Sequence, residues 1–455
     1  METVSLLGYS SVVDVKTQKF TASGKFSLLR GLSRLVPNQL HRRCSWTPLM
    51  TRCQSSIGFK VANSKYRHEL KAAIDVVERA CELCRSVQTS MNEKGSSFSS
   101  GGSFEKKDAT PVTVADFGVQ ALVSLELGLL FPSIPLVGEE DAGQLRKDLE
   151  QNKVGNDNSN LSESPALIEL VTQEVAKVAS NQVKCVTTEK IMDAIDRGGK
   201  RIKTGSHQRN RSYWTWRCPV GLALVVDGEL VLGVMGCPNV SYAINGGAVF
   251  VKPKSQKVRD ADGDEPSPTG LVMAACTGCG CWVKPLSKRI SRCDGQQTLE
   301  DLLEEMTVSK VDECMTLREA KFCISDHEVW SSLPLAGALA SRAAVDDRVT
   351  ADKADILPLC CGSLCKYFAV ASGGASLFIL HLEEGSYVKV WDHAAGVICV
   401  TEAGGQVTDV RGKPVQEMIG DGQALFKPEG GGILVTNGRL GEKVRSCFTP
   451  AESSS

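Results

Sequence analysis

The sequence predicts an α/β protein with two lobes, and three observations point to this class. Apolar residues recur at helical spacing between Tyr66 and Val87, the pattern of an amphipathic helix. Two apolar runs, residues 222–226 and 230–235, flank Asp227-Gly228, which is a hairpin signal between antiparallel strands. After residue 310, helix-like and strand-like stretches alternate, as in an α/β lobe. The length of 455 residues suits this arrangement but also two or three domains.

The composition argues against several classes of partner. Apolar residues make up 42% of the chain and charged residues 23%, as in ordinary soluble proteins. A formal net charge of −1 gives no electrostatic reason to expect nucleic acid or an anionic membrane as partner. The sequence contains no run of about eighteen apolar residues, so it predicts no membrane-spanning helix. We expect a small-molecule partner, and the sequence gives no basis for an oligomeric state.

The eighteen cysteines are dispersed along the chain, which predicts mostly reduced thiols rather than a disulfide framework. Two clusters could supply thiolates to zinc: Cys81-x-x-Cys84 and Cys276-x-x-Cys279-x-Cys281. Neither has a second pair or a His at the spacing of a zinc finger, so structural cysteines are the favoured interpretation.

Residues 1–58 have the composition of an organellar transit peptide. They contain two acidic residues against eight Lys and Arg, with many Ser. Residues 26–36 would form a basic amphipathic helix, which favours the mitochondrion, with the chloroplast as the alternative. A disordered basic tail is the plainer interpretation of the same composition.

Residues 110–120 contain the first candidate site residue. Thr113 and Asp116 are three positions apart where a helix is predicted to begin, so the plain interpretation is a helix cap made by Thr113. That interpretation explains Asp116 less well, because Glu or Gln would serve a cap equally.

Two further segments carry carboxylates. Glu139, Glu140 and Asp141 follow a predicted apolar strand, and three adjacent acids repel one another unless a cation is present. A solvated turn is the alternative. Asp392 follows Trp391 at the start of an apolar segment of small residues, where a buried carboxylate needs a partner. A helix N-cap is the alternative there.

Taken together and in this order, these segments resemble the inositol monophosphatase superfamily. Its marks are a V-T-x-A-D helix start, a G-E-E carboxylate pair, a central D-P-I-D-G-T and a late W-D-x-x-A-G. Its adenosine 3′,5′-bisphosphate (PAP) phosphatase branch, including plant organellar members, is similar in four segments: residues 112–120, 137–141, 232–239 and 391–396. The resemblance spans roughly residues 65 to 445.

The resemblance implies a layered αβαβα sandwich. An N-terminal α+β lobe would cover residues 65–285 and carry the metal-site carboxylates. A C-terminal α/β lobe would cover residues 286–446 and carry a nucleotide pocket, followed by a short tail at 447–455. The implied enzyme is a Mg²⁺-dependent 3′(2′),5′-bisphosphate nucleotidase of sulfur assimilation, which hydrolyses PAP to AMP and phosphate.

The resemblance also implies roles for individual residues. Glu139 and Asp392 would bind Mg²⁺, and Asp116 would help to activate the attacking water. Phosphoryl transfer to water needs this chemistry, and carboxylates suit a hard cation such as Mg²⁺.

Four residues would bind substrate, which is PAP, with PAPS or inositol phosphates as further substrates: Ser325, His327, Ser363 and Lys366. Of these, Ser363 and Lys366 would hold phosphate. The Arg that the branch carries near Leu380 or His381 is absent.

The central D-P-I-D-G-T is missing from this sequence. Asp193 and Asp196 form a similar D-A-I-D segment and are possible substitute metal ligands. However, the branch carries a comparable segment upstream of its true motif, so a mimic is the favoured interpretation. With only Glu139 and Asp392 available, we expect Mg²⁺ affinity and turnover to fall by orders of magnitude.

Residues 201–219 stand where that motif is expected, and they are basic and aromatic without apolar periodicity. A solvated loop is the plain interpretation. Reading codons 205–211 one nucleotide later permits Asp-Pro-Ile-(Asn or Ser)-Gly-Thr, so we hypothesise a frame-shifted or mis-spliced reading of the gene.

The sequence leaves two alternatives for the function. The chain could be a catalytically impaired relative that only binds nucleotide or a partner, or it could be an inositol phosphate phosphatase.

Overall fold

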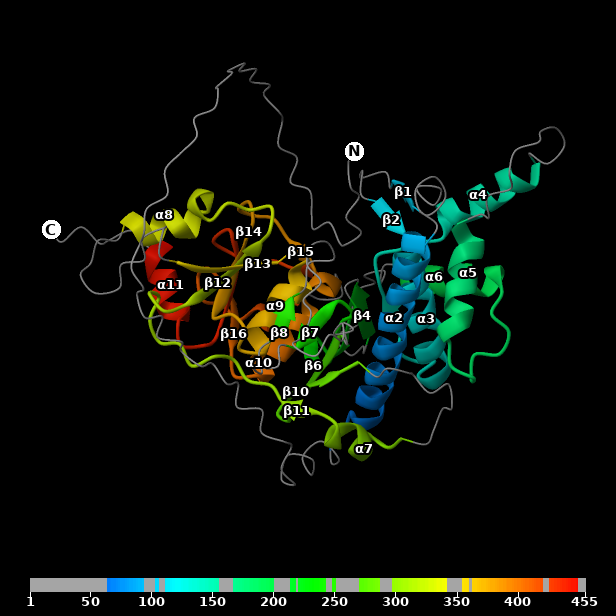
Figure 1. Ribbon diagram of the computed structural model, residues 1–455, viewed down its shortest axis with the longest axis horizontal. Helices are drawn as coiled ribbons and strands as arrows, with labels where there is room; N and C mark the ends of the chain where they lie inside the picture. Colours follow the sequence, from blue (N-terminus) through cyan, green and yellow to red (C-terminus); the bar gives the residue numbers. More distant parts are fainter. Residues whose placement is uncertain are drawn as a thin grey trace, which may run out of the picture.

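The computed structural model describes most of the chain after residue 63, namely residues 64–93, 103–105, 111–154, 167–199, 213–217, 220–242, 248–250, 270–286, 297–341, 354–359, 362–419 and 425–448. These residues form five layers in the order helices, sheet, helices, sheet, helices (Figure 1). The predicted α/β class and layered αβαβα order are therefore confirmed. The predicted transit peptide, residues 200–212 and residues 449–455 lie outside the described residues.

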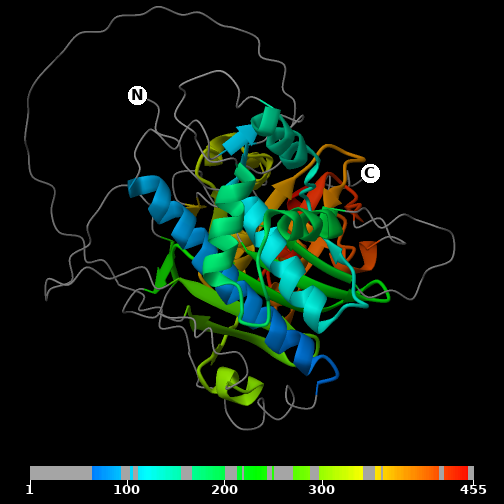
Figure 2. The same cartoon turned by 90° about the vertical axis from the view of Figure 1, so that its right-hand side faces the viewer.

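The first layer consists of helices that cover one face of the larger sheet, as Figure 2 shows for the blue and cyan ribbons. Its helices are α2 (Arg67–Glu93), α3 (Val114–Leu130), α5 (Leu167–Val178) and α6 (Thr188–Gly199). The helix predicted from Tyr66 to Val87 is confirmed as α2. Helix α4 (Gly143–Val154) and the strand pair β1 (Ser103–Glu105) and β2 (Pro111–Thr113) lie at the edge of this layer.

The larger sheet has seven strands in the order β11-β10-β9-β6-β5-β4-β3. Its strands are β3 (Leu136–Val137), β4 (Tyr213–Arg217), β5 (Gly221–Val226), β6 (Glu229–Cys237), β9 (Leu271–Cys276), β10 (Gly280–Pro285) and β11 (Thr307–Val308). The predicted hairpin is confirmed, because β5 and β6 are antiparallel and the turn residues Asp227 and Gly228 have φ of 55° and 85°.

The structure contains two strands, β4 and β11, that the sequence does not predict. Strand β4 lies within residues 201–219 and pairs with β3 on one side and β5 on the other, so a loop does not describe residues 213–217. Strand β11 follows residue 286 and pairs with β10, so the first sheet continues into the predicted C-terminal lobe. The division of the chain at residue 286 stays a prediction.

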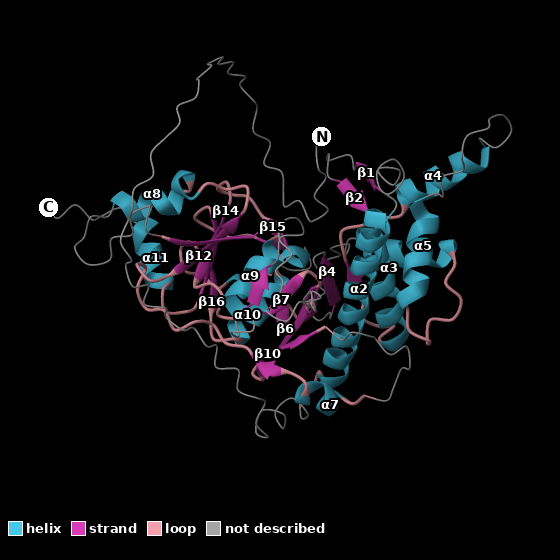
Figure 3. Cartoon of the chain, viewed as in Figure 1, coloured by secondary structure: helices cyan, strands magenta, loops and turns pink. Residues whose placement is uncertain are grey.

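The middle layer is formed by α9 (Ser363–Ala371) and α10 (Ala394–Glu402), which lie between the two sheets (Figure 3). Alternate residues of β5 face opposite layers, so Leu222 packs toward α2 whereas Ala223 packs toward α10. Helix α10 approaches closely, because a Cβ added at Gly233 of β6 would collide with Ile398.

The second sheet has five strands in the order β13-β12-β14-β18-β16. Its strands are β12 (Lys321–Ser325), β13 (Asp355–Leu359), β14 (Leu377–His381), β16 (Gln406–Asp409) and β18 (Gly432–Thr436). Helices α8 (Pro334–Ser341) and α11 (Gly441–Phe448) cover its outer face. The alternation predicted after residue 310 is therefore confirmed.

Shorter elements connect these layers: α7 (Leu299–Glu304), β7 (Val240–Tyr242), β8 (Ala248–Phe250), β15 (Val388–Lys389), β17 (Leu425–Phe426), and the 3-10 helices η3 (Trp330–Ser332), η5 (Val390–Asp392) and η6 (Val415–Met418). Among the described helices, none combines the length and apolar character that crossing a membrane requires.

Candidate functional site

Helix α3 carries Asp116 in its first turn, which is the place the sequence predicted for a helix start. One turn further on, the Gln120 side chain is fully buried. Its amide donates to the carbonyls of Glu140 and Ile195, each at 2.6 Å, and its oxygen accepts from the Glu140 amide at 3.0 Å. Gln120 therefore fixes the acidic segment against the helix that carries Asp116.

The three adjacent acids after β3 have different surroundings. Glu139 is one-fifth exposed, and its Oε1 lies 3.5 Å from the Lys389 ammonium. Glu140 is buried, whereas Asp141 is exposed and accepts a hydrogen bond from the Gly143 amide before α4. Glu139 is therefore partly exposed and paired with a cation.

Asp392 lies at the end of η5, three residues after Lys389, and leads into α10. The next residue, His393, is buried, with its Nδ1 3.1 Å from the Tyr367 hydroxyl. Burial, together with a smaller effect of the Asp392 charge, raises the pKa of Tyr367. Because Lys389 contacts Glu139 across 250 residues of sequence, the segments that carry Glu139 and Asp392 meet in the fold.

The donor set at this place fits Mg²⁺ in kind. Carboxylate oxygens are the ligands that Mg²⁺ prefers, and proteins commonly bind it through one or two carboxylates with water and phosphate oxygens. In the structure the Lys389 ammonium supplies positive charge beside the Glu139 carboxylate. Within the described residues, no group of three or more His, Cys, Asp or Glu is arranged to hold a metal ion.

Asp193 and Asp196 on α6 are held by Arg146 of α4. The Arg146 guanidinium lies 3.2 Å from Asp193 and 2.5 Å from Asp196, and the Ala142 amide donates to Asp196 at 2.8 Å. These contacts raise the pKa of Arg146, with the hydrogen bond to Asp196 as the largest cause. The structure therefore gives both carboxylates a structural partner, and their use as substitute metal ligands stays a prediction.

Ser325 and Lys366 are brought together at the carboxyl end of β12. Lys366 is buried in α9, and its ammonium donates to the Ser325 hydroxyl at 2.9 Å and lies 5.8 Å from the centre of the Phe378 ring. The Ser325 amide donates to Glu328 at 2.7 Å. Lys366 is therefore a desolvated cation with hydrogen-bonding groups beside it, and neither Lys366 nor Ser325 is among the residues that line the neighbouring pocket.

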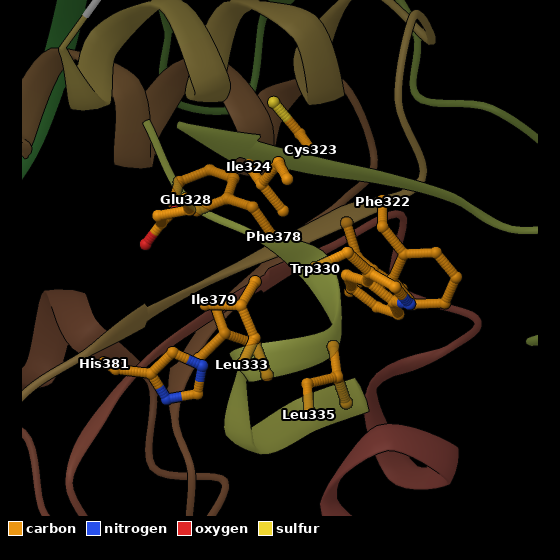
Figure 4. A pocket seen from close by; sticks show the side chains of 11 residues that line it. Phe322, Cys323, Ile324, Glu328, Trp330, Leu333, Leu335, Phe378, Ile379 and His381 are labelled. Atoms are coloured by element: carbon orange, nitrogen blue, oxygen red, sulfur yellow. The ribbon is translucent and has the colours of Figure 1, made fainter. Parts of the chain in front are cut away.

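The pocket at this strand end is lined by apolar and titratable side chains (Figure 4). Figure 4 places Glu328 and His381 on one side and Trp330 beside Phe322 on the other. Burial lowers the pKa of His381, and the Glu328 charge opposes that change. Burial also raises the pKa of Cys323 to about 12, so this thiol stays protonated at neutral pH.

The other two predicted substrate residues are placed differently. Ser363 is the first residue of α9, so it lies at a helix N-terminus, where backbone amides favour an anion. The His327 side chain is 79% exposed and lies 3.8 Å from Asp326. His327 does not line the pocket that Glu328 and His381 share. The substrate contacts of both residues stay predictions.

Sequence reasoning missed Gln120, Lys389 and Glu328. Gln120 had a detectable signal, because it is a polar residue on the apolar face of a predicted helix and a buried amide needs partners. Glu328 directly follows His327 in the segment that the sequence singled out. Lys389 gave no signal, since its partner Glu139 is 250 residues away.

Comparisons with known proteins point to one family. A family model described as the inositol monophosphatase family matches residues 217–446. An Arabidopsis thaliana protein, provisionally named a mitochondrial 3′(2′),5′-bisphosphate nucleotidase, is 37% identical over 416 residues, which cover 88% of this chain and 91% of the relative. A 3′(2′),5′-bisphosphate nucleotidase of Oryza sativa is 30% identical over 401 residues, which cover 84% of this chain and 93% of the relative. The alignment with a solved inositol monophosphatase from Anabaena (Nostoc) sp. PCC 7120 covers 86% of this chain and 100% of the solved chain, at 14% identity and a TM-score of 0.43.

Proposed function

This chain belongs to the inositol monophosphatase family, and we propose that it is a Mg²⁺-dependent phosphatase that converts adenosine 3′,5′-bisphosphate to AMP and phosphate. The observation that carries the proposal is the meeting of the Glu139 and Asp392 segments around Lys389. Relatives named as bisphosphate nucleotidases, at 37% and 30% identity, support the nucleotide as substrate.

The residues around Glu139 have the chemistry for hydrolysis of a phosphate monoester. Mg²⁺, held by the carboxylates of Glu139 and Asp392, would supply positive charge for the phosphate oxygens and lower the pKa of a bound water. Asp116 orients the attacking water and takes its proton. The Lys389 ammonium, already beside Glu139, adds positive charge near the reacting phosphate.

The second phosphate of the substrate needs its own cation. Lys366 and Ser325 are hydrogen-bonded to each other at 2.9 Å in a buried setting, and Ser363 lies at the start of the same helix. A buried ammonium makes strong charge-assisted hydrogen bonds with phosphate oxygens. Two separate cationic sites, one at Lys389 and one at Lys366, suit a nucleoside bisphosphate better than a substrate with a single phosphate.

The cellular location that we propose is the mitochondrion. The basic composition of residues 1–58 favours it, and the Arabidopsis thaliana relative is named a mitochondrial protein. A fluorescent fusion of residues 1–58 in plant cells tests this proposal, and accumulation of the fusion in chloroplasts would contradict it.

Substrate profiling tests the proposed specificity. The purified full chain is given PAP, PAPS and inositol 1-phosphate at equal concentration, and phosphate release is measured with Mg²⁺ present. We expect the highest kcat/KM with PAP. Preference for inositol 1-phosphate would assign the chain to the inositol phosphate alternative.

A further inference from the structure

The β9–β10 hairpin brings two cysteines together at its turn. Cys276 ends β9 and is paired in register with Gly280, the first residue of β10. The Cys279 amide donates to the Cys276 carbonyl at 2.9 Å, which makes residues 276–279 a hydrogen-bonded β-turn. Such a turn keeps its end Cα atoms within about 7 Å, the range in which disulfides occur.

The side chains of Cys276 and Cys279 pack on the same side of the sheet. Cys276 is 1% exposed, packs toward the first helix layer and has its Sγ 3.4 Å from the Ser64 hydroxyl. Cys279 is partly exposed and packs against the same hydrophobic cluster as Cys276, where the two thiols interact. Cys279 therefore reaches solvent, whereas Cys276 is buried.

The third cysteine of the segment, Cys281, has its side chain on the opposite face of the sheet. Cys281 is buried toward α10, where its thiol interacts with that of Cys399. Strand alternation separates it from Cys276, because residues on the two faces of β10 pack into different layers. Cys281 therefore serves as an internal control for the pair.

We propose that Cys276 and Cys279 are a redox modification site, which closes to a reversible disulfide by exchange with a low-molecular-weight disulfide such as glutathione disulfide. The Cys279 thiolate attacks one sulfur of that disulfide, forms a mixed disulfide and releases one thiol. The Cys276 thiolate then attacks the Cys279 sulfur, forms the internal disulfide and releases the second thiol. Two protein thiols are oxidised, one external disulfide is reduced to two thiols, and their protons pass to the leaving thiolates.

The order of these steps follows from burial. Burial raises the pKa of Cys276 to about 12, so Cys276 is protonated at neutral pH and Cys279, which reaches solvent, attacks first. The closing step needs the Cys276 thiolate, so its rate rises with pH in the alkaline range below this pKa.

The turn is held in place from outside while the disulfide forms. Glu402, the last residue of α10, accepts hydrogen bonds from the amides of Gly278 and Gly280, each at 2.9 Å. Both glycines have positive φ, 72° and 108°, so the turn is already in its tight conformation. Formation of the disulfide would break the contact between the Cys276 thiol and the Ser64 hydroxyl.

The test uses the reduced full chain, incubated with increasing ratios of oxidised to reduced glutathione at pH 8. Free thiols are then alkylated, and the peptide that contains residues 276–281 is analysed by mass spectrometry. We expect this peptide to carry two alkyl groups fewer than the peptide from the reduced chain, as a disulfide between two of its thiols requires, and to regain both when dithiothreitol is added before alkylation. An unchanged mass in oxidised glutathione alone would overturn the proposal without any variant.

Three variants identify the partners. Cys281→Ala should retain the mass loss, whereas Cys279→Ser should abolish it. Cys276→Ser should stop at the mixed disulfide with glutathione, because the closing thiol is missing. Loss of the disulfide in Cys281→Ala would overturn the assignment, since it would place the bond at Cys281.

Discussion

Gln120 and Glu140 are joined by a reciprocal pair of hydrogen bonds between one side chain and one backbone unit. The Gln120 amide nitrogen donates to the Glu140 carbonyl at 2.6 Å, and the Glu140 amide donates to the Gln120 oxygen at 3.0 Å. The same amide nitrogen also donates to the Ile195 carbonyl at 2.6 Å. One buried side chain thus ties α3, which carries Asp116, to the segment that carries Glu139 and to α6.

Replacing Gln120 should destabilise the chain strongly. Gln120→Leu keeps the volume but leaves two buried carbonyls and one amide without this partner, which costs about 2–4 kcal/mol in the free energy of unfolding. Urea unfolding measures this cost. Gln173→Leu, at an exposed position of α5, is the control and should change stability by less than about 0.5 kcal/mol. Equal effects of the two substitutions would show that the reciprocal pair contributes little.

Lys366→Met should weaken substrate binding. The variant keeps an unbranched side chain but removes the ammonium that reaches Ser325 and lies over the Phe378 ring, so we expect KM for PAP to rise about tenfold or more. Lys321→Met is the control, since Lys321 lies on β12 with its side chain 41% exposed beside Asp355. Steady-state kinetics compare the two. An unchanged KM in Lys366→Met would exclude Lys366 from the substrate site.

The buried ion pair between Arg79 and Glu126 joins α2 to α3. Glu126 is 4% exposed, lies 2.7 Å from Arg79 and also accepts from the Ser180 amide at 2.9 Å. Glu126→Gln removes the carboxylate charge that faces the buried Arg79 guanidinium and should cost about 3 kcal/mol in urea unfolding.

The matched control for that pair lies on the surface of α2. Lys71 and Asp75 are 2.6 Å apart and each is 29% exposed, so Asp75→Asn should cost no more than about 0.5 kcal/mol. A cost of the same size in both variants would mean that burial does not set the strength of the Arg79–Glu126 pair.

Glu78 should make stability fall as pH rises. Burial raises its pKa above the ordinary 4.5, and the Lys284 ammonium 2.9 Å away opposes that rise. A raised pKa means that the folded chain keeps a proton which the unfolded chain has lost, so the free energy of unfolding decreases as pH increases above 4.5. Glu78→Gln removes this contribution. Urea unfolding between about pH 4.5 and 7 should show a shallower decline in the variant, and parallel curves would refute this prediction.

The sequence predicted those features whose cause is local. Helix α2 follows from apolar spacing, and the β5–β6 hairpin follows from Asp227-Gly228, whose positive φ angles suit that turn. The place of Asp116 at the start of α3 was predicted for the same reason.

Features that depend on distant contacts were not predicted. The Glu139–Lys389 pair joins residues 250 positions apart, and no periodicity reports such a meeting. The sequence predicts a loop at residues 201–219 because they lack apolar alternation, yet residues 213–217 form strand β4, whose neighbours on both sides supply its backbone hydrogen bonds. The Tyr, Trp and Thr residues of β4 belong to the types that are enriched in strands, and pairing with two neighbouring strands fixes the element there.

The central claim is that this chain hydrolyses PAP through a Mg²⁺ site at Glu139 and Asp392. The most direct measurement is phosphate release from PAP by the purified full chain while Mg²⁺ is varied, with Asp392→Asn as the matched variant and nucleotide binding measured in parallel by calorimetry. We expect release that requires Mg²⁺ and is lost in Asp392→Asn, while PAP still binds to both proteins. Binding of PAP without phosphate release at any Mg²⁺ concentration would contradict the claim and identify a chain that only binds nucleotide.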